Sequence, residues 1–176
     1  PGGICFIEEL AGVYDSDCNC ALFPTASVQA EVEWNSDCGS RSIVIGLFNL
    51  GYPELNDEVE SELDGLGNFS IPQMPVGTYH LYITIEGFLS VLLSDLVVLE
   101  GANSISIPEL IPGDMNGSNG VNIEDVSLIC ASFGFETGDD EYNQLADLNC
   151  DGFVNILDYT ILIAHFGLNG APFPYE

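Results

Sequence analysis

Apolar and polar residues alternate along much of the first two thirds of the chain. Between residues 28 and 34 the apolar positions are Val28, Ala30, Val32 and Trp34, and the residues between them are Gln or Glu. A period of two predicts a strand with one buried face and one face in water. A second alternating stretch has its apolar residues at Tyr79, Leu81, Ile83 and Ile85.

Glycine and proline turns divide this region into six or seven short predicted strands. Residues 41–50 are more continuously apolar, which suits a strand in the core of a sandwich. Residues 51–67 are acidic, and we expect a solvated loop there rather than an extra cation site, because the carboxylates lack a fixed spacing. The pattern predicts an antiparallel β-sandwich over residues 27–112, preceded by a Cys-rich, irregular segment at residues 1–26.

Beyond Pro108 and Pro112, with almost no linker, the apolar spacing becomes helical. The apolar positions of the two predicted helices are Val126, Ile129, Cys130 and Phe133, followed by Tyr159, Leu162, Ile163 and Phe166. We expect these two apolar faces to pack together. The predicted fold class is therefore α+β and multidomain, with an antiparallel β-sandwich followed by a small two-helix module at residues 113–176.

Each predicted helix follows a twelve-residue loop, and the two loops begin 33 residues apart, at Asp114 and Asp147. Oxygen-bearing side chains stand at positions 1, 3, 5, 9 and 12, which with a carbonyl at position 7 is the spacing that wraps a calcium ion. Zinc would favour Cys and His, which these positions lack. We expect two calcium ions. The predicted ligands are Asp114, Asn116, Ser118, the Gly120 carbonyl, Asn122 and Asp125, then Asp147, Asn149, Asp151, the Phe153 carbonyl, Asn155 and Asp158.

The two loops differ at positions 5 and 6. Position 6 needs a positive φ and is Gly152 in the second loop but Asn119 in the first. Asn tolerates the left-handed region better than most residues, so we expect the first loop to make the same turn. Position 5 is Asp151 in the second loop and Ser118 in the first. With one fewer carboxylate, the first loop is expected to bind calcium more weakly.

The net charge is −27, with 28 acidic residues and one basic residue, Arg41. Nothing in such a chain neutralises phosphate, which excludes nucleic acids and anionic membrane surfaces as partners. The longest apolar run, residues 88–99, is interrupted by Ser94 and Asp95 and is too short to span a bilayer. Apolar burial, disulfides and calcium must therefore offset the self-repulsion of this chain.

Six cysteines are present, at positions 5, 18, 20, 38, 130 and 150. An even number beside calcium loops indicates an oxidising, extracellular setting. Cys130 and Cys150 lie in the two repeats and are predicted to pair, while the other four would link the N-terminal region. Because the chain starts at Pro1 without Met, we expect a mature product or a fragment.

A catalytic role finds little support in the residues. A nucleophile needs a base nearby, and the two histidines, His80 and His165, fall in a predicted strand and a predicted helix. No Gly-rich phosphate loop occurs. We expect a protein that is not an enzyme.

Residues 113–167 resemble a dockerin, a small calcium-folded module of two loop-helix repeats found on secreted and cell-surface proteins of bacteria and archaea. The resemblance rests on the ten ligand side chains named above, with Val121 and Val154 and with Ile123 and Ile156 at matching positions. Residues 27–107 look more loosely like the transthyretin-like or carboxypeptidase-regulatory β-sandwich, through residues 67–71, 76–81 and 87–88.

A dockerin is expected to bind a cohesin domain with the helix faces just after its loops. This chain has Ile123, Glu124, Ile156 and Leu157 where small hydroxyl residues are typical, so that face is expected to pack on the sandwich or on another copy. Two hypotheses follow. In the first, the chain is a self-assembling extracellular structural subunit, and residues 4–13 are either a strand donated to a neighbour or packed on their own domain. In the second, it is the recognition module of a secreted protein and binds a cohesin-like partner.

Overall fold

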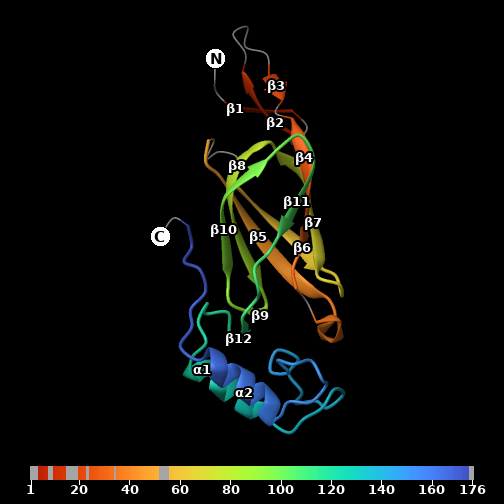
Figure 1. The fold of residues 1–176 in the computed structure, drawn as a ribbon, viewed down its shortest axis with the longest axis vertical. Coiled ribbons are helices and arrows are strands. Elements are labelled where there is room, and N and C mark those ends of the chain that lie inside the picture. The colour runs from red at the N-terminus through yellow and green to blue at the C-terminus, as the bar shows by residue number, and fades with distance from the viewer. Residues whose placement is uncertain are drawn as a thin grey trace.

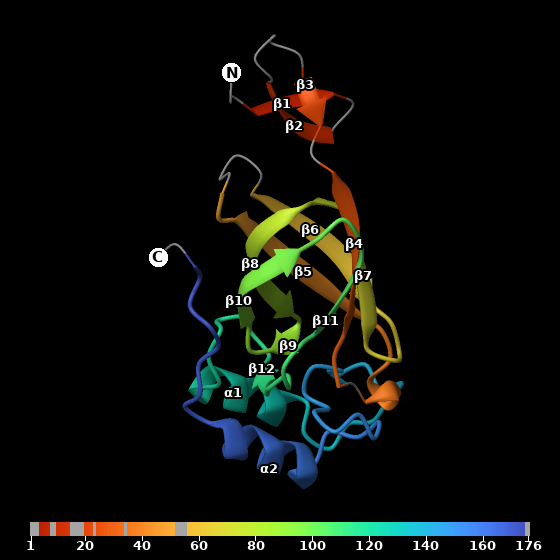
Figure 2. The ribbon, with the colours of Figure 1, turned by 45° about the horizontal axis from the view of Figure 1, so that its top comes forward.

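The structure, a computed structural model, describes residues 4–7, 10–14, 20–22, 24–33, 35–51 and 56–174, and for the first three of these ranges only the backbone. A small N-terminal sheet, a β-sandwich and a two-helix module follow one another along the long axis (Figure 1). The C-terminal segment runs back from the helices along the sandwich (Figures 1 and 2). No helix in these ranges is long and apolar enough to cross a membrane.

The N-terminal segment forms strands, so the prediction that it is irregular is wrong. The strands are β1 (Ile4–Ile7), β2 (Leu10–Tyr14) and β3 (Cys20–Leu22), and they form a sheet in the order β1-β2-β3. β1 pairs antiparallel with β2 of the same chain. The segment that we considered as a donated strand therefore has a partner strand within its own hairpin.

The sandwich consists of a four-stranded sheet, β10-β8-β5-β6, facing a three-stranded sheet, β11-β4-β7. Its strands are β4 (Thr25–Glu31), β5 (Arg41–Asn49), β6 (Asp57–Leu63), β7 (Asn68–Pro75), β8 (Gly77–Ile85), β10 (Val91–Val98) and β11 (Gly101–Ser106). Six of these are joined by antiparallel pairing, but β11 pairs parallel with β4. The connection after β10 carries the chain from one sheet to the other, which explains why the purely antiparallel prediction fails at β11.

The core of the sandwich confirms the alternation read from the sequence. The predicted inward residues that are buried are Val28, Ala30 and Val32, with Tyr79, Leu81, Ile83 and Ile85. Trp34 lies outside the described residues. Burial of one apolar face from each sheet stabilises the sandwich by the hydrophobic effect.

The acidic stretch expected to be a loop contains strand β6, so that prediction is wrong for residues 57–63. β6 pairs antiparallel with β5 over its whole length. Leu63 is buried, Val59 and Ser61 are half-buried, and the acidic side chains between them are exposed. The alternation was missed because only two of the three inward residues are apolar.

The helical module joins the sandwich through short irregular elements and a shared core. The sandwich contributes the 3₁₀ helix η1 (Ser36–Cys38) and β9 (Gly87–Phe88) to this junction. The module consists of β12 (Pro112–Asp114), α1 (Ile123–Ala131) and α2 (Ile156–His165). β12 pairs with β9, which extends from the sandwich. Leu89, which follows β9, is buried together with the module's own residues Met115, Val121, Ile129, Ala146, Val154 and Leu162.

The buried stripe of each helix is narrower than predicted. Ile129 and Leu162 are fully buried, but Cys130, Phe133, Ile163 and Phe166 are exposed, so the prediction that they form the packed faces is wrong. Each helix has about ten residues and buries an aspartate and an apolar residue four positions apart, Asp125 with Ile129 and Asp158 with Leu162.

The predicted Cys130–Cys150 disulfide is wrong. Cys150 is bonded to Cys38 in η1, across 112 residues of sequence, and Cys130 is an exposed free thiol. Cys130 lies on the outer face of α1, whereas Cys150 lies in the second loop where that loop meets the sandwich. The side chains of Cys5, Cys18 and Cys20 lie outside the described residues.

Candidate calcium centre and docking face

Four aspartates are the buried acidic residues of the described ranges, and they stand at positions 1 and 12 of the two loops. Their exposed fractions are 4% for Asp114, 0% for Asp125, 4% for Asp147 and 0% for Asp158. Burying a carboxylate without a compensating positive charge is costly, and this chain has one basic residue. The arrangement therefore favours the binding of a cation from solution.

Within each loop the two buried carboxylates are close enough to repel each other. Burial raises the pKa of Asp114, and the negative charge of Asp125 raises it further. Burial likewise raises the pKa of Asp158, with an additional contribution from Asp147. A divalent cation between the members of each pair would favour the ionised forms.

In the first loop, backbone amides orient both carboxylates. Asp114 accepts hydrogen bonds from the backbone N–H groups of Ser118 (2.9 Å) and Asn119 (2.8 Å). Asp125 accepts one from the backbone N–H of Asn122 at 2.9 Å. The loop is thus wrapped around its own first and last residues, as a calcium loop requires.

The second loop repeats this arrangement. Asp147 accepts from the backbone N–H groups of Asp151 (3.1 Å) and Gly152 (2.8 Å), and Asp158 accepts from that of Asn155 (2.8 Å). Position 6 is left-handed in both loops, with φ of 61° at Asn119 and 87° at Gly152. The prediction that Asn119 adopts the same left-handed turn as Gly152 is confirmed.

The position 9 residues are the N-caps of the two helices. The Oδ1 of Asn122 accepts from the backbone N–H of Glu124 at 2.7 Å, and that of Asn155 accepts from Leu157 at 2.8 Å. The position 12 aspartates complete a capping box in each helix. Since the Asn oxygens serve the helix termini, they would reach a metal ion through water, which is common at position 9.

Positions 3 and 5 contribute neutral or exposed oxygens. Asn116 and Asn149 each accept a backbone N–H from the position 5 residue, both at 3.0 Å. Asp151 is exposed and accepts from the Asn149 side-chain amide at 3.0 Å. Across the described residues there is no cluster of three or more Asp, Glu, His or Cys side chains close enough to hold a metal. Each loop instead combines two buried carboxylates with amide, hydroxyl and carbonyl oxygens, which suits a hard cation such as calcium.

Two residues that the sequence analysis did not single out for the calcium loops support the predicted ligands. Glu124 accepts from the Asn116 amide at 2.7 Å, and the Tyr142 hydroxyl donates to Asp147 at 2.8 Å. Glu124 occupies position 11, which supplies no ligand in the twelve-residue pattern, and Tyr142 precedes its loop. The spacing of the ligand positions therefore could not predict either contact.

Each loop pairs with the segment that follows the other repeat's helix. The Gly167 N–H donates to the Val121 carbonyl at 2.8 Å, and the Gly134 N–H donates to the Val154 carbonyl at 2.7 Å. Val121 and Val154 are 33 residues apart, as are Gly134 and Gly167, so the two hydrogen bonds are equivalent in the two repeats. The repeats are thus related by an approximate two-fold symmetry. This pairing explains why a Phe-Gly sequence follows each helix.

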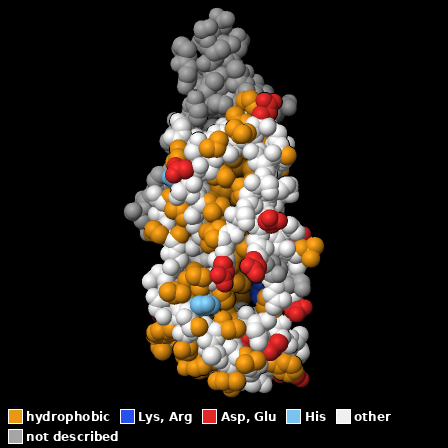
Figure 3. Space-filling view, in the orientation of Figure 1, with side chains coloured by type: hydrophobic (Ala, Val, Ile, Leu, Met, Phe, Trp, Pro, Cys, Tyr) orange, Lys and Arg blue, Asp and Glu red, His pale blue; other side chains and the backbone are white. Residues whose placement is uncertain are grey.

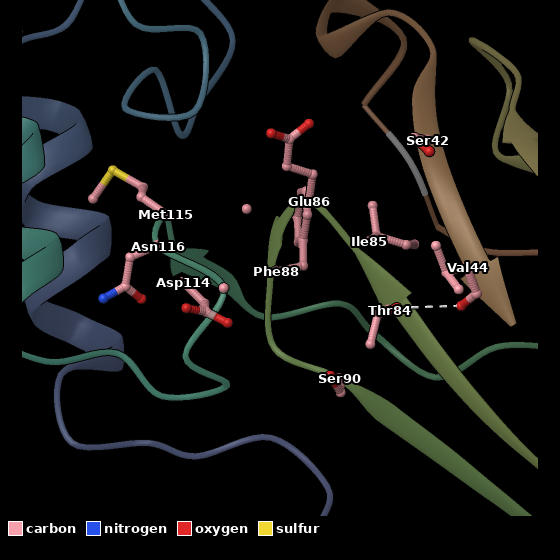
Figure 4. Close-up of a pocket in the computed structure, with 12 residues that line it drawn as sticks. Ser42, Val44, Thr84, Ile85, Glu86, Phe88, Ser90, Asp114, Met115 and Asn116 are labelled. Carbon is pink, nitrogen blue, oxygen red and sulfur yellow. Dashed lines mark hydrogen bonds between the residues drawn. The ribbon is translucent and has the colours of Figure 1, made fainter. Parts of the chain in front are cut away.

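The first loop borders an open cavity at the junction with the sandwich. The cavity has a volume of about 410 Å³. Figure 4 shows Asp114 and Asn116 on the side of the loop and Glu86 and Phe88 on the side of the sandwich. At the corresponding junction of the second loop, a cavity lined by Arg41 and Cys150 among others measures only about 10 Å³.

The helix faces next to the loops expose large apolar residues. The exposed fractions are 69% for Ile123, 62% for Ile156 and 55% for Leu157. Apolar side chains cover much of the surface over α1 and α2 (Figure 3). The alternative that this face packs on the sandwich of the same chain is therefore wrong. A contiguous exposed apolar surface is typical of an interaction site.

The rings of both histidines form hydrogen bonds with backbone groups. The Nδ1 of His80 accepts from the Asp95 backbone N–H at 3.2 Å, and the Nδ1 of His165 lies 3.0 Å from the Pro112 carbonyl. The second contact ties α2 to β12 and so to the sandwich.

Residues 112–167 match the family model described as dockerin type I domain. The chain is 27% identical over 122 residues, 66% of its length, to the cellulosomal-scaffolding proteins B and A of Acetivibrio thermocellus. It spans only 16% and 6% of those two relatives. Two interface mutants of a type II cohesin–X–dockerin complex from Acetivibrio cellulolyticus contain a chain of similar fold. Their TM-scores are 0.63 and 0.62 at 23% and 24% identity, with 82% and 84% of this chain and 97% of each matched chain covered.

These comparisons characterise the C-terminal part of the molecule: residues 112–167 match the dockerin type I domain, which supports calcium as the bound ion. The fold likeness extends over most of the chain and therefore includes the sandwich. The α+β fold class is confirmed. The finer resemblance of the sandwich to the transthyretin-like fold stays a prediction.

Proposed function

We propose that this chain is a non-enzymatic, extracellular recognition module that binds a cohesin domain through the exposed face of α1 and α2. The observation that carries the proposal is the apolar surface beside the calcium loops, formed by Ile123, Ile156 and Leu157, which no described part of the chain covers. The dockerin match and the cohesin–X–dockerin complexes of similar fold support a cohesin as the partner. The hypothesis of a self-assembling subunit receives less support, because the comparisons offer nothing in favour of self-association.

Two calcium ions would hold this face in place. The proposed ligands are the predicted ones in each loop, with Asn122 and Asn155 reaching the ion through water. Because the position 12 aspartates also cap the helices, calcium binding would fix the first turn of each helix, which carries Ile123 or Ile156. Binding of the partner is therefore expected to require calcium.

The relatives differ in the type of interaction, so the test uses both cohesin types. The family model is of type I, whereas the complexes of similar fold are of type II. An apolar face has few hydrogen-bonding groups and should select a cohesin with an apolar surface. Calorimetric titration of the full chain with a panel of type I and type II cohesins, in calcium and in chelator, should find a calcium-dependent partner.

The variants Ile156→Thr and Leu157→Thr should weaken that binding at least tenfold each, about 1.4 kcal/mol. The matched control is Leu66→Thr, which shortens an exposed apolar side chain in the turn between β6 and β7, on neither helix. Unchanged affinity in both helix variants would reject this face as the docking surface. Filaments or large oligomers in calcium, with no cohesin bound, would favour the structural-subunit hypothesis instead.

A further inference from the structure

One residue of the first loop, Asn119, contacts the sandwich and the C-terminal segment at the same time. Its Oδ1 accepts a hydrogen bond from the backbone N–H of Ser90 at 2.9 Å. Its Nδ2 donates to the Ala171 carbonyl at 2.8 Å and to the Tyr82 hydroxyl at 3.3 Å. Ser90 and Tyr82 belong to the sandwich region, and Ala171 belongs to the segment after α2. Every polar atom of this amide is therefore used in joining three parts of the chain.

The C-terminal segment closes over this contact without spare room. The Ala171 N–H donates to the Ser90 carbonyl at 2.9 Å, and the Gly170 N–H donates to the Asn119 carbonyl at 3.0 Å. A Cβ on Gly170 would overlap the Asn119 Oδ1 and lie 2.6 Å from the Ser90 nitrogen. Phe173 then packs edge-on against Tyr82, with the ring centroids 5.2 Å apart.

Asn119 is also part of the calcium loop. Its backbone N–H donates to Asp114 Oδ2 at 2.8 Å, and its φ is 61°, a conformation that costs less for Gly. The equivalent residue of the second loop is Gly152. The first loop thus has a side chain at the turn where the second has none, and that side chain makes the contacts with the sandwich.

We propose that Asn119 links calcium occupancy of the first loop to the docking of the β-sandwich on the dockerin domain. Calcium would fix Asp114 and the turn that it organises, and so place the Asn119 amide between Ser90 and Ala171. By thermodynamic reciprocity, the docked sandwich favours the calcium-bound loop as much as calcium favours docking. In this scheme the Asn119 side chain positions the sandwich and the C-terminal segment, and it does not bind the metal ion. The inference rests on calcium binding by the first loop and does not require a cohesin partner.

Hydrogen exchange of the full chain, with calcium and with chelator, tests this link. Calcium should increase the protection of the sandwich segment 82–93 in the wild type. In Asn119→Gly, which relieves the left-handed residue but removes the amide, calcium should still protect α1 and α2 while the gain in segment 82–93 is lost. Calcium affinity of the first loop should fall severalfold, because the three side-chain hydrogen bonds that support the bound form are missing.

The variant Tyr82→Phe gives an independent readout from the sandwich side. It removes the hydroxyl that bonds Asn119 and Ala171 but keeps the ring against Phe173, and it lies outside the calcium loop. It should reduce the calcium-dependent gain partially, and the double variant should add little to Asn119→Gly.

The proposal is overturned if segment 82–93 gains the same protection in Asn119→Gly as in the wild type, or gains none in the wild type. If Asn119→Gly loses the gain in segment 82–93 but binds its cohesin with full affinity, the link is supported and the proposed cohesin binding also stands. Should Asn119→Gly fail to fold, Tyr82→Phe decides: an undiminished calcium-dependent gain in that variant rejects the link.

Discussion

The two calcium loops share one backbone plan but are attached to the sandwich by different chemistry. The first loop is held by hydrogen bonds of the Asn119 side chain. The second is held by the Cys38–Cys150 disulfide and by a hydrogen bond from the Asn35 amide to the Asn149 carbonyl at 3.1 Å. Cys150 has a φ of 60°, so each attachment uses a non-glycine residue in the left-handed region.

This difference separates a permanent attachment from one that can respond to the loop's own order. A covalent bond holds the second loop against the sandwich whatever its metal content, and the junction there is nearly filled. The first loop depends on hydrogen bonds beside an open cavity. Two repeats with the same ligand spacing can thus differ in coupling, because the residues that join them to the rest of the fold lie outside the ligand positions.

The largest effect is expected from Asp158→Ala, which removes a buried carboxylate, a predicted calcium ligand and the capping partner of α2. Helical circular dichroism and calcium-dependent stability should both fall, by at least about 2 kcal/mol, while the sandwich stays folded. Asp125→Ala is the matched change in the first loop and should cost less calcium affinity if the second loop is the tighter site. Full calcium-dependent stabilisation of Asp158→Ala would mean that the ligand assignment is wrong.

Cys38→Ser tests the covalent attachment of the second loop. The disulfide closes a long loop, and its loss should lower the free energy of unfolding by about 2–5 kcal/mol, chiefly through the entropy of the unfolded chain. Chemical denaturation under non-reducing conditions measures this change. Cys130→Ser is the control, because that thiol is exposed and free. Equal stability of the two variants would show that the second loop does not need its covalent attachment.

Glu124→Gln tests whether Glu124 supplies negative charge to the first loop, which has Ser118 where the second loop has Asp151. The Glu124 carboxylate accepts from the Asn116 amide and keeps the Asn116 oxygen turned toward the loop, while the second loop uses Asp151 for the same purpose. Calcium affinity of the first loop should fall severalfold, corresponding to about 1 kcal/mol, with the second loop unaffected. Glu109→Gln removes the same charge elsewhere on the exposed surface and should have a negligible effect in calcium titrations. A similar loss in both variants would indicate a general effect of net charge.

Asp64→Asn concerns a sandwich turn in which a carboxylate is stabilised without metal, and the smallest effect is expected there. Backbone N–H groups of Asn68 and Leu66 hold the pKa of Asp64 below its ordinary value of 3.8. Because the folded-state pKa is the lower one, the ionised carboxylate stabilises the fold above pH 3.8 and this contribution is lost as the pH falls through the folded-state pKa. The wild type should therefore unfold at a higher temperature than Asp64→Asn near neutral pH, and the difference should shrink in acid. A constant difference across that range would contradict the assignment.

Local sequence was sufficient to predict the two turns before the helices and most strands. A loop's ligand spacing is set within twelve consecutive residues, and a strand's buried face is set by alternation, so both are visible without the tertiary structure. The same local reading failed for β6, where Ser61 interrupts the apolar face, and for the parallel pairing of β11 with β4. Pairing depends on which sheet receives a strand, and no local pattern encodes that choice.

By itself, the amino-acid sequence determined that the C-terminal third contains two oxygen-lined turns, each followed by a helix, in a chain almost without positive charge. Only the tertiary structure decided that Cys150 pairs with Cys38, that Ile123 and Ile156 stay in solvent, and that Asn119 meets Ser90 and Ala171. Those contacts join residues that are tens of positions apart. They depend on how the sandwich, the loops and the C-terminal segment pack against one another, and packing is a property of the whole fold.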